Sequence, residues 1–168
     1  MKLAEALILR ADCQKKISQL RQRLSRCVKV QEGEQPPEDP QVLLGELSGA
    51  IAQLTTLVQR INRTNASTAF VRVSEAMPQA ITSPQELPDN LSDALARRDT
   101  LAIQRNALQN IVQEAALTHN RYSRSEVKVV STVDVSDLQR QVDSLAQEYR
   151  LLDTQIQSLN WQVDVLES

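Results

Sequence analysis

The sequence predicts an all-α protein, an elongated antiparallel helical bundle or coiled coil, and two observations support this class. Apolar residues recur at alternating spacings of three and four over residues 135–166 without a break, which is the heptad pattern of a long helix packed along one seam. Aromatic residues are only 2% of the chain and Gly only 3 residues, which is typical of aliphatic cores between uninterrupted helices. We expect one helical domain over residues 1–168, with helices at about 3–29, 41–62, 91–117 and 135–166.

The first predicted helix, residues 3–29, carries its apolar side chains on one face. Cys13 and Cys27 share that face fourteen residues apart, which is ~21 Å along a helix. A disulfide within the chain is excluded because bonded Cα atoms lie within ~7 Å. We interpret both thiols as small buried hydrophobes in a reducing compartment. Gly33 is expected to end the helix, and the prolines of residues 31–40 form the turn that reverses the chain.

The second predicted helix, residues 41–62, has an unusually wide apolar stripe. Its width predicts a helix that is contacted on two sides rather than one. One set of residues repeats the spacing of three and four, and a second set widens the stripe: Leu44, Leu47, Ile51, Leu54, Val58 and Ile61, then Leu43, Ala50 and Leu57.

An irregular connection is expected over residues 63–90, with a short extended segment at 69–73. The third predicted helix follows at 91–117, with Asn90 or Ser92 as its N-cap. Arg98 and Arg105 fall seven residues apart at the edge of its apolar face. Their stems are expected to cover apolar surface while their heads reach water; the alternative is a pair of buried cations that await an acid or an anionic ligand.

The valines of residues 125–133 predict a second short extended segment, after which Asp134 or Ser136 caps the last helix. The flanks of its seam carry few charges, which predicts that neighbouring helices cover them. Trp161 lies farthest from the seam, with Val165 one turn on and Leu151 nearby. We interpret these three residues as a contact surface between subunits. The seam itself consists of Val135, Leu138, Val142, Leu145, Tyr149, Leu152, Ile156, Leu159, Val163 and Leu166.

Composition and charge disfavour several classes of protein. The formal net charge of -2 provides no general attraction for nucleic acid or a membrane surface. No run of 18 apolar residues is present and the amino-terminal apolar run is interrupted by Glu5, so we expect neither a transmembrane helix nor a signal peptide, and a cytoplasmic location. The chain has one histidine, His119, and no Gly-rich phosphate loop or metal-ligand spacing, so we expect no enzyme, no metal and no cofactor.

Three polar stretches remain. They are Arg60-Ile61-Asn62-Arg63-Thr64-Asn65, Ala96-Arg97-Arg98-Asp99, and the segment from Asn120 to Val135. Together with the start Met-Lys-Leu-Ala-Glu-Ala-Leu, they resemble the septicolysin-like family of bacterial proteins, a domain of unknown function. The resemblance implies an all-helical coiled-coil protein that self-associates, with no established activity. The family name suggests a cytolysin, but no membrane-inserting segment is evident, and this function is the least favoured.

These stretches also raise the hypothesis of an anionic site. Arginine forks, amides and hydroxyls are the groups that bind phosphate or carboxylate. The alternative is that the same arginines pair with Asp and Glu and fix the helix connections. The candidate anion-binding residues are Arg60, Arg63, Arg97, Arg98, Arg121, Arg124 and Lys128.

The function predicted first is therefore that of a structural or interaction protein that assembles into a homo-oligomer through coiled-coil helix packing. A binding module for a phosphate-rich or other anionic ligand is the alternative. Nucleic acid is not favoured as that ligand, because the polar stretches lack interleaved aromatic residues for stacking bases. The biochemical role of the protein does not follow from its sequence.

Overall fold

A computed structural model describes residues 1–71, 88–116 and 130–167. The predicted all-α class with four long helices is confirmed. The described residues contain two isolated β-bridges but no strand. Of the extended segment predicted at 125–133, residues 125–129 lie outside the described residues and residues 130–133 form no strand. Of the one predicted at 69–73, only Ala69, Phe70 and Val71 are described. The helices are α1 (Leu3–Cys27), α2 (Pro40–Ser67), α3 (Leu91–Ala116) and α4 (Val135–Gln162).

Three helices begin at side-chain caps, and two of these caps, Asn90 and Asp134, are among the predicted candidates. In each, an Asp or Asn oxygen accepts a hydrogen bond from a backbone N–H in the first turn, which satisfies a donor that has no partner inside the helix. Pro40 follows its cap as the first residue of α2, where a missing N–H costs nothing. The cap pairs are Asp39 with the N–H of Gln41 at 2.8 Å, Asn90 with Asp93 at 3.0 Å, and Asp134 with Asp137 at 3.0 Å.

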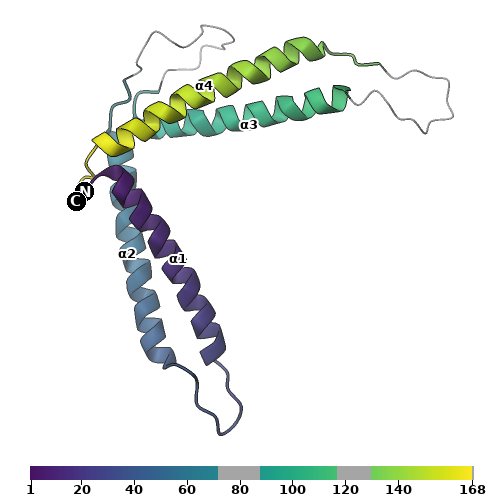
Figure 1. Cartoon of the computed structure of the whole chain (residues 1–168). Coiled ribbons are helices and arrows are strands. Elements are labelled where there is room, and N and C mark those ends of the chain that lie inside the picture. Colours follow the sequence, from purple (N-terminus) through teal and green to yellow (C-terminus); the bar gives the residue numbers. More distant parts are fainter. Residues whose placement is uncertain (72–87, 117–129, 168) are drawn as a thin grey trace, which may run out of the picture. The chain divides into compact units, whose positions relative to one another are not determined.

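The chain divides into two compact units, Met1–Thr68 with Ser158–Ser168, and Ala69–Gln157. The single domain expected over residues 1–168 stays a prediction. In the first unit, α1 and α2 run antiparallel side by side (Figure 1). Their core includes Leu20, Leu24, Cys27, Leu43 and Ala50, with Ile17 and Leu47 packed against it.

The face of α1 that meets α2 follows the heptad spacing closely. Cys13 and Cys27 occupy it, are 7% and 5% exposed and are not disulfide-bonded. Their burial agrees with their interpretation as small hydrophobes. Buried residues recur at intervals of three, four or seven positions along this face: Leu3, Ala6, Cys13, Leu20, Leu24 and Cys27.

The helix ends differ from the predicted boundaries at three places. Helix α1 ends at Cys27, and Gly33, with φ of 90°, instead forms a turn in which Glu34 N–H donates to Gln31 O. Helix α2 continues to Ser67, five residues beyond the predicted end at 62. Helix α4 ends at Gln162 rather than 166, because the chain after it leaves the helix to pair with the amino terminus.

The second unit contains α3 and most of α4, which run side by side in opposite directions (Figure 1). The heptad seam predicted for the last helix matches the burial observed along α4. Val142, Leu145, Leu152 and Ile156 are all buried, with Ile156 fully so. On α3, the buried residues are Leu91, Ala94, Leu101 and Val112.

Candidate functional site

Helix α2 carries two overlapping apolar stripes, and α1 covers only one of them. The stripe toward α1 holds Leu43, Ala50 and Leu57, which are 2%, 4% and 7% exposed. The other stripe includes Leu44 and Ile51, which are 45% and 48% exposed. The width of the predicted stripe is therefore confirmed, but only one of the two expected contact sides is filled by α1. We call the face that α1 leaves uncovered the outward stripe of α2. It consists of Leu44, Ser48, Ile51, Thr55 and the partly buried Val58.

The outward stripe is uncharged from residue 47 to residue 59, and two glycines lie beside it. Residues 47–59 contain no Lys, Arg, Asp or Glu. A Cβ atom added at Gly45 or Gly49 would meet nothing within 4 Å, so both glycines border open space. An uncharged, half-apolar helix face without side-chain obstruction is suited to another helix.

By length and composition alone, α2 is the one helix among the described residues that is long and apolar enough to cross a membrane. The same criteria are met by a helix that packs in the core of a water-soluble protein. Burial of Leu43, Ala50 and Leu57 in the hairpin with α1 accounts for part of its apolar character. The outward stripe accounts for another part.

Arg97 and Arg98 of α3 are both bound to carboxylates in the second unit. Arg97 Nη2 lies 2.8 Å from Glu148 Oε1, and the two side chains are 20% and 28% exposed. Arg98 lies 2.9 Å from Asp99 and 3.3 Å from Asp153. Burial opposes the charge of Arg98, but the hydrogen bonds that its guanidinium donates to Asp99 and Asp153 outweigh this effect and raise the pKa of the guanidinium. These contacts support structural pairing of the two arginines.

Arg105 has a different partner. Its guanidinium carbon lies 5.7 Å from the centre of the Tyr149 ring, which is cation–π geometry. The sequence placed Arg98 and Arg105 at the edge of an apolar face, and both are partly buried there. The expectation that both heads reach water is not met at Arg98, whose guanidinium contacts Asp99 and Asp153. That contact corresponds to the alternative, a partly buried cation that pairs with an acid.

The remaining anion-site candidates are only partly described. Arg60 is partly buried, and its Nε atom is buried without a hydrogen-bond partner among the described residues. Arg63 is exposed. Residues Arg121, Arg124 and Lys128 lie outside the described residues. Convergence of these arginines on one anionic site stays a prediction.

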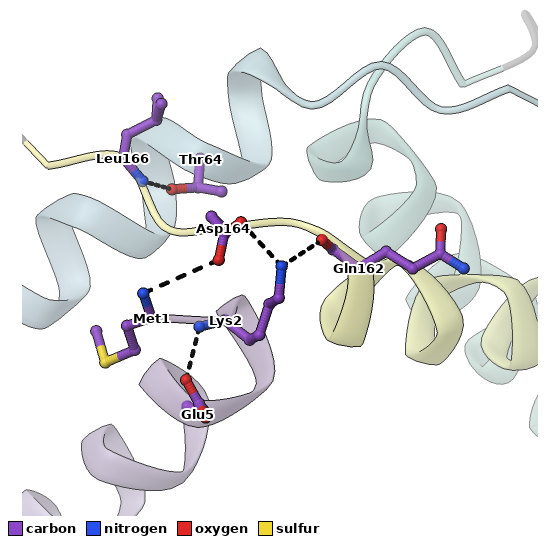
Figure 2. Close-up of polar contacts among 7 residues, drawn as sticks. All are labelled: Met1, Lys2, Glu5, Thr64, Gln162, Asp164 and Leu166. Atoms are coloured by element: carbon purple, nitrogen blue, oxygen red, sulfur yellow. Dashed lines mark hydrogen bonds and ion pairs between the residues drawn. The ribbon is translucent and has the colours of Figure 1, made fainter.

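The two ends of the chain pair with each other inside the first unit, a feature that the sequence did not predict. Lys2 and Asp164 form an antiparallel bridge. Leu3 N–H donates to Val163 O at 2.9 Å, and Val165 N–H donates to Met1 O at 2.9 Å. We call this pairing the terminal bridge. Figure 2 shows that Lys2 Nζ also reaches the Asp164 carboxylate, at 2.8 Å, and the Gln162 carbonyl, at 3.0 Å.

Thr64 of α2 joins the terminal bridge to the hairpin. Its side chain is 1% exposed, and its hydroxyl donates to Arg60 O at 2.8 Å. The same hydroxyl accepts from Leu166 N–H at 3.0 Å (Figure 2). The hydroxyl thus supplies an acceptor for a backbone N–H beyond the end of α4. Thr64 lies seven residues after Leu57 and continues the stripe that faces α1, which explains why α2 extends beyond the predicted boundary.

The predicted subunit-contact residues have three different environments. Trp161 is 58% exposed. Leu151 is partly buried. Val165 is 6% exposed within the chain, because it lies in the segment that pairs with Met1. Of the three, Trp161 presents the largest accessible surface to a partner.

The described part of the chain shows no metal-binding cluster. No group of three His, Cys, Asp or Glu side chains that could hold a metal ion occurs there. His119 lies outside the described residues. Cys13 and Cys27 are buried on α1. The absence of an enzymatic activity stays a prediction.

Comparisons with known proteins give a family and a related structure, but no activity. The model of a family of unknown function, DUF6847, matches residues 10–165. The structure is similar to that of a functionally unknown conserved protein from Corynebacterium diphtheriae, with a TM-score of 0.83 and 40% identity over 99% of each chain. No curated protein matches the chain. Nothing in these matches bears on the resemblance to septicolysin-like proteins, which stays a prediction.

Proposed function

This chain belongs to the DUF6847 family, whose function is unknown, and we propose that it is a structural or interaction protein that self-assembles by helix packing. The single observation that supports this proposal most is the outward stripe of α2. Leu44 and Ile51 occur at heptad spacing on an uncharged helix face and are 45% and 48% exposed. A second helix seated on this face would bury both side chains.

Burial of the outward stripe against another helix would be driven by the hydrophobic effect. Removal of apolar surface from water contributes roughly 25 cal/mol per Å², and residues 47–59 present no charge that would have to be desolvated. An association driven in this way should depend little on salt, unlike binding to phosphate groups. Trp161 adds a second large exposed side chain, of a type that is enriched at protein interfaces.

We propose that the protein acts as a cytoplasmic homo-oligomer and has no enzymatic activity. The alternative, a module for an anionic ligand, has less support, since Arg97 and Arg98 already contact Glu148, Asp99 and Asp153. Both arginines would have to exchange these carboxylates for the ligand.

Native mass spectrometry on the full chain, purified at low salt and then measured across a salt series, tests the proposal. We expect a discrete oligomer of the 18.8 kDa chain that carries no additional mass and persists as salt increases. Extra mass that dissociates with added salt would favour the anionic ligand. A ligand-free monomer at all protein concentrations would contradict self-assembly.

A further inference from the structure

We propose that the partner of the outward stripe is the same stripe of a second copy of this chain, in antiparallel orientation about a two-fold axis at Ile51. This inference rests on the proposed function, because it names the partner and the geometry of self-assembly. The stripe is suited to pairing with itself in three respects: the spacing of its apolar residues, the alternation of large and small side chains, and the distribution of charge along α2.

The apolar residues of the stripe are symmetric about Ile51. Leu44 precedes Ile51 by seven residues and Val58 follows it by seven. An antiparallel copy therefore places Leu44 opposite the partner subunit's Val58 and the two Ile51 side chains against each other. The contact spans fourteen residues, or ~21 Å of helix, which is three layers of side chains.

Small side chains alternate with large ones along the same face. Ser48 lies between Leu44 and Ile51, and Thr55 lies between Ile51 and Val58. Ser48 and Thr55 are exposed. Such alternation allows the large side chains of one helix to enter the spaces beside the small side chains of the other, as in knobs-into-holes packing.

Charge distribution favours the antiparallel over the parallel orientation. Glu46 lies toward the amino end of α2, whereas Arg60 and Arg63 lie toward its carboxyl end. Parallel pairing would place each charge beside its own copy, which is repulsive. Antiparallel pairing brings the acidic end of one helix toward the basic end of the other, and it also opposes the two helix dipoles favourably.

The absence of charge from the stripe favours a second copy of the chain over a charged partner. Residues 47–59 offer no charge with which an acidic or basic surface could pair, whereas a two-fold axis requires only that the face be complementary to itself. A shared axis also limits the assembly through this face to a closed dimer.

Cross-linking between single-cysteine-substituted proteins tests the orientation. Leu44→Cys and Val58→Cys are purified separately as full chains and treated with a short bis-maleimide, alone and as a mixture. We expect a covalent dimer in the mixture, and little in either protein alone, because the two Leu44 positions of an antiparallel pair lie ~21 Å apart. Thr56→Cys, on an exposed position outside the stripe, serves as the control. The native thiols, Cys13 and Cys27, are buried.

The outcomes separate this inference from the proposed function. Covalent dimers of Leu44→Cys alone would show parallel pairing and overturn the inference. Oligomers in native mass spectrometry without any of these cross-links would leave self-assembly standing but place it on another surface. A monomer that yields no cross-link would contradict both. If either substitution perturbs the helical circular dichroism, Gln41→Cys mixed with Asn62→Cys tests the same antiparallel orientation at exposed polar positions that lie one residue out of register.

Discussion

The ammonium of Lys2 and the carboxylate of Asp164 lie 2.8 Å apart, although 162 positions separate the two residues. Around this contact, backbone hydrogen bonds join Met1 to Val165 and Leu3 to Val163. The pairing attaches the segment after α4 to the start of α1 within one compact unit. An ordinary surface ion pair contributes little to stability, but here it accompanies main-chain pairing that closes the end of the helical hairpin.

The terminal bridge makes stability sensitive to acid. The hydrogen bond from Lys2 holds the pKa of Asp164 below its usual value of 3.8, and the charge of the amino terminus adds to this effect. The contribution of Asp164 is therefore complete above pH 3.8 and is lost as the pH falls through the lower pKa of the folded state. The free energy of unfolding, measured with urea at a series of pH values, should therefore fall less steeply at acid pH in Asp164→Asn than in the unsubstituted protein. If the acid dependence of the unfolding free energy were unchanged in Asp164→Asn but altered in the control Asp12→Asn, Asp164 would not be the group responsible.

Thr64→Val should destabilise the fold, because it leaves Leu166 N–H without its acceptor. This hydrogen bond is partly buried, so we expect a cost of about 1 kcal/mol, the typical net contribution of one hydrogen bond. Thr56→Val is the matched control: the Thr56 hydroxyl is exposed and donates only to Ala52 O within its own helix. Chemical unfolding measures both. An equal effect of the two substitutions would show that the Thr64 hydroxyl does not stabilise the carboxyl-terminal segment.

The helices were predictable because their signals are local. Apolar faces identified all four, and Asn90 and Asp134 were among the predicted caps of the last two. The terminal bridge was not predictable, because Lys2 and Asp164 show no periodicity that links them. A polar residue in a heptad position, Thr64, was the one available sign that α2 continues toward a polar contact.

The candidate site was only half predictable for a related reason. The sequence showed that the stripe of α2 is wide enough for two contacts, but both stripes have the same heptad spacing. Which of them faces α1 depends on the geometry of the hairpin, and the structure places Leu43 inside and Leu44 outside. The pairing of Arg97 with Glu148 likewise depends on the relative register of two helices, which composition and spacing do not specify.

Leu20→Ala should destabilise the first unit far more than Ile8→Ala does. Leu20 is 1% exposed and belongs to the core between α1 and α2, whereas Ile8, on the same helix, is 53% exposed. A buried Leu→Ala substitution costs about 2–5 kcal/mol because it leaves a cavity, and an exposed one usually costs within about 0.5 kcal/mol. Thermal unfolding followed by circular dichroism compares the two. Similar melting temperatures would mean that the core is not at this position.

The Arg97–Glu148 pair should show measurable coupling in a double-mutant cycle. Both side chains are mostly buried, at 20% and 28% exposed, so the pair is weakly screened by solvent. We expect a coupling free energy of about 1 kcal/mol between Arg97→Met and Glu148→Gln. The pair of Arg140 and Asp137, 74% and 52% exposed, should couple more weakly. Equal coupling in both pairs would show that burial does not strengthen the Arg97 contact.

In the proposed dimer, the outward stripe of α2 holds the two copies together. The molar mass of Ile51→Glu, measured by light scattering during size exclusion, tests this role. We expect the unsubstituted chain to form a species of twice its 18.8 kDa mass and Ile51→Glu to run as a monomer with unchanged helix content. Ile103→Glu, which alters an isoleucine of α3 that is 71% exposed, should remain dimeric. An Ile51→Glu protein that retains the mass of the unsubstituted oligomer would contradict the claim.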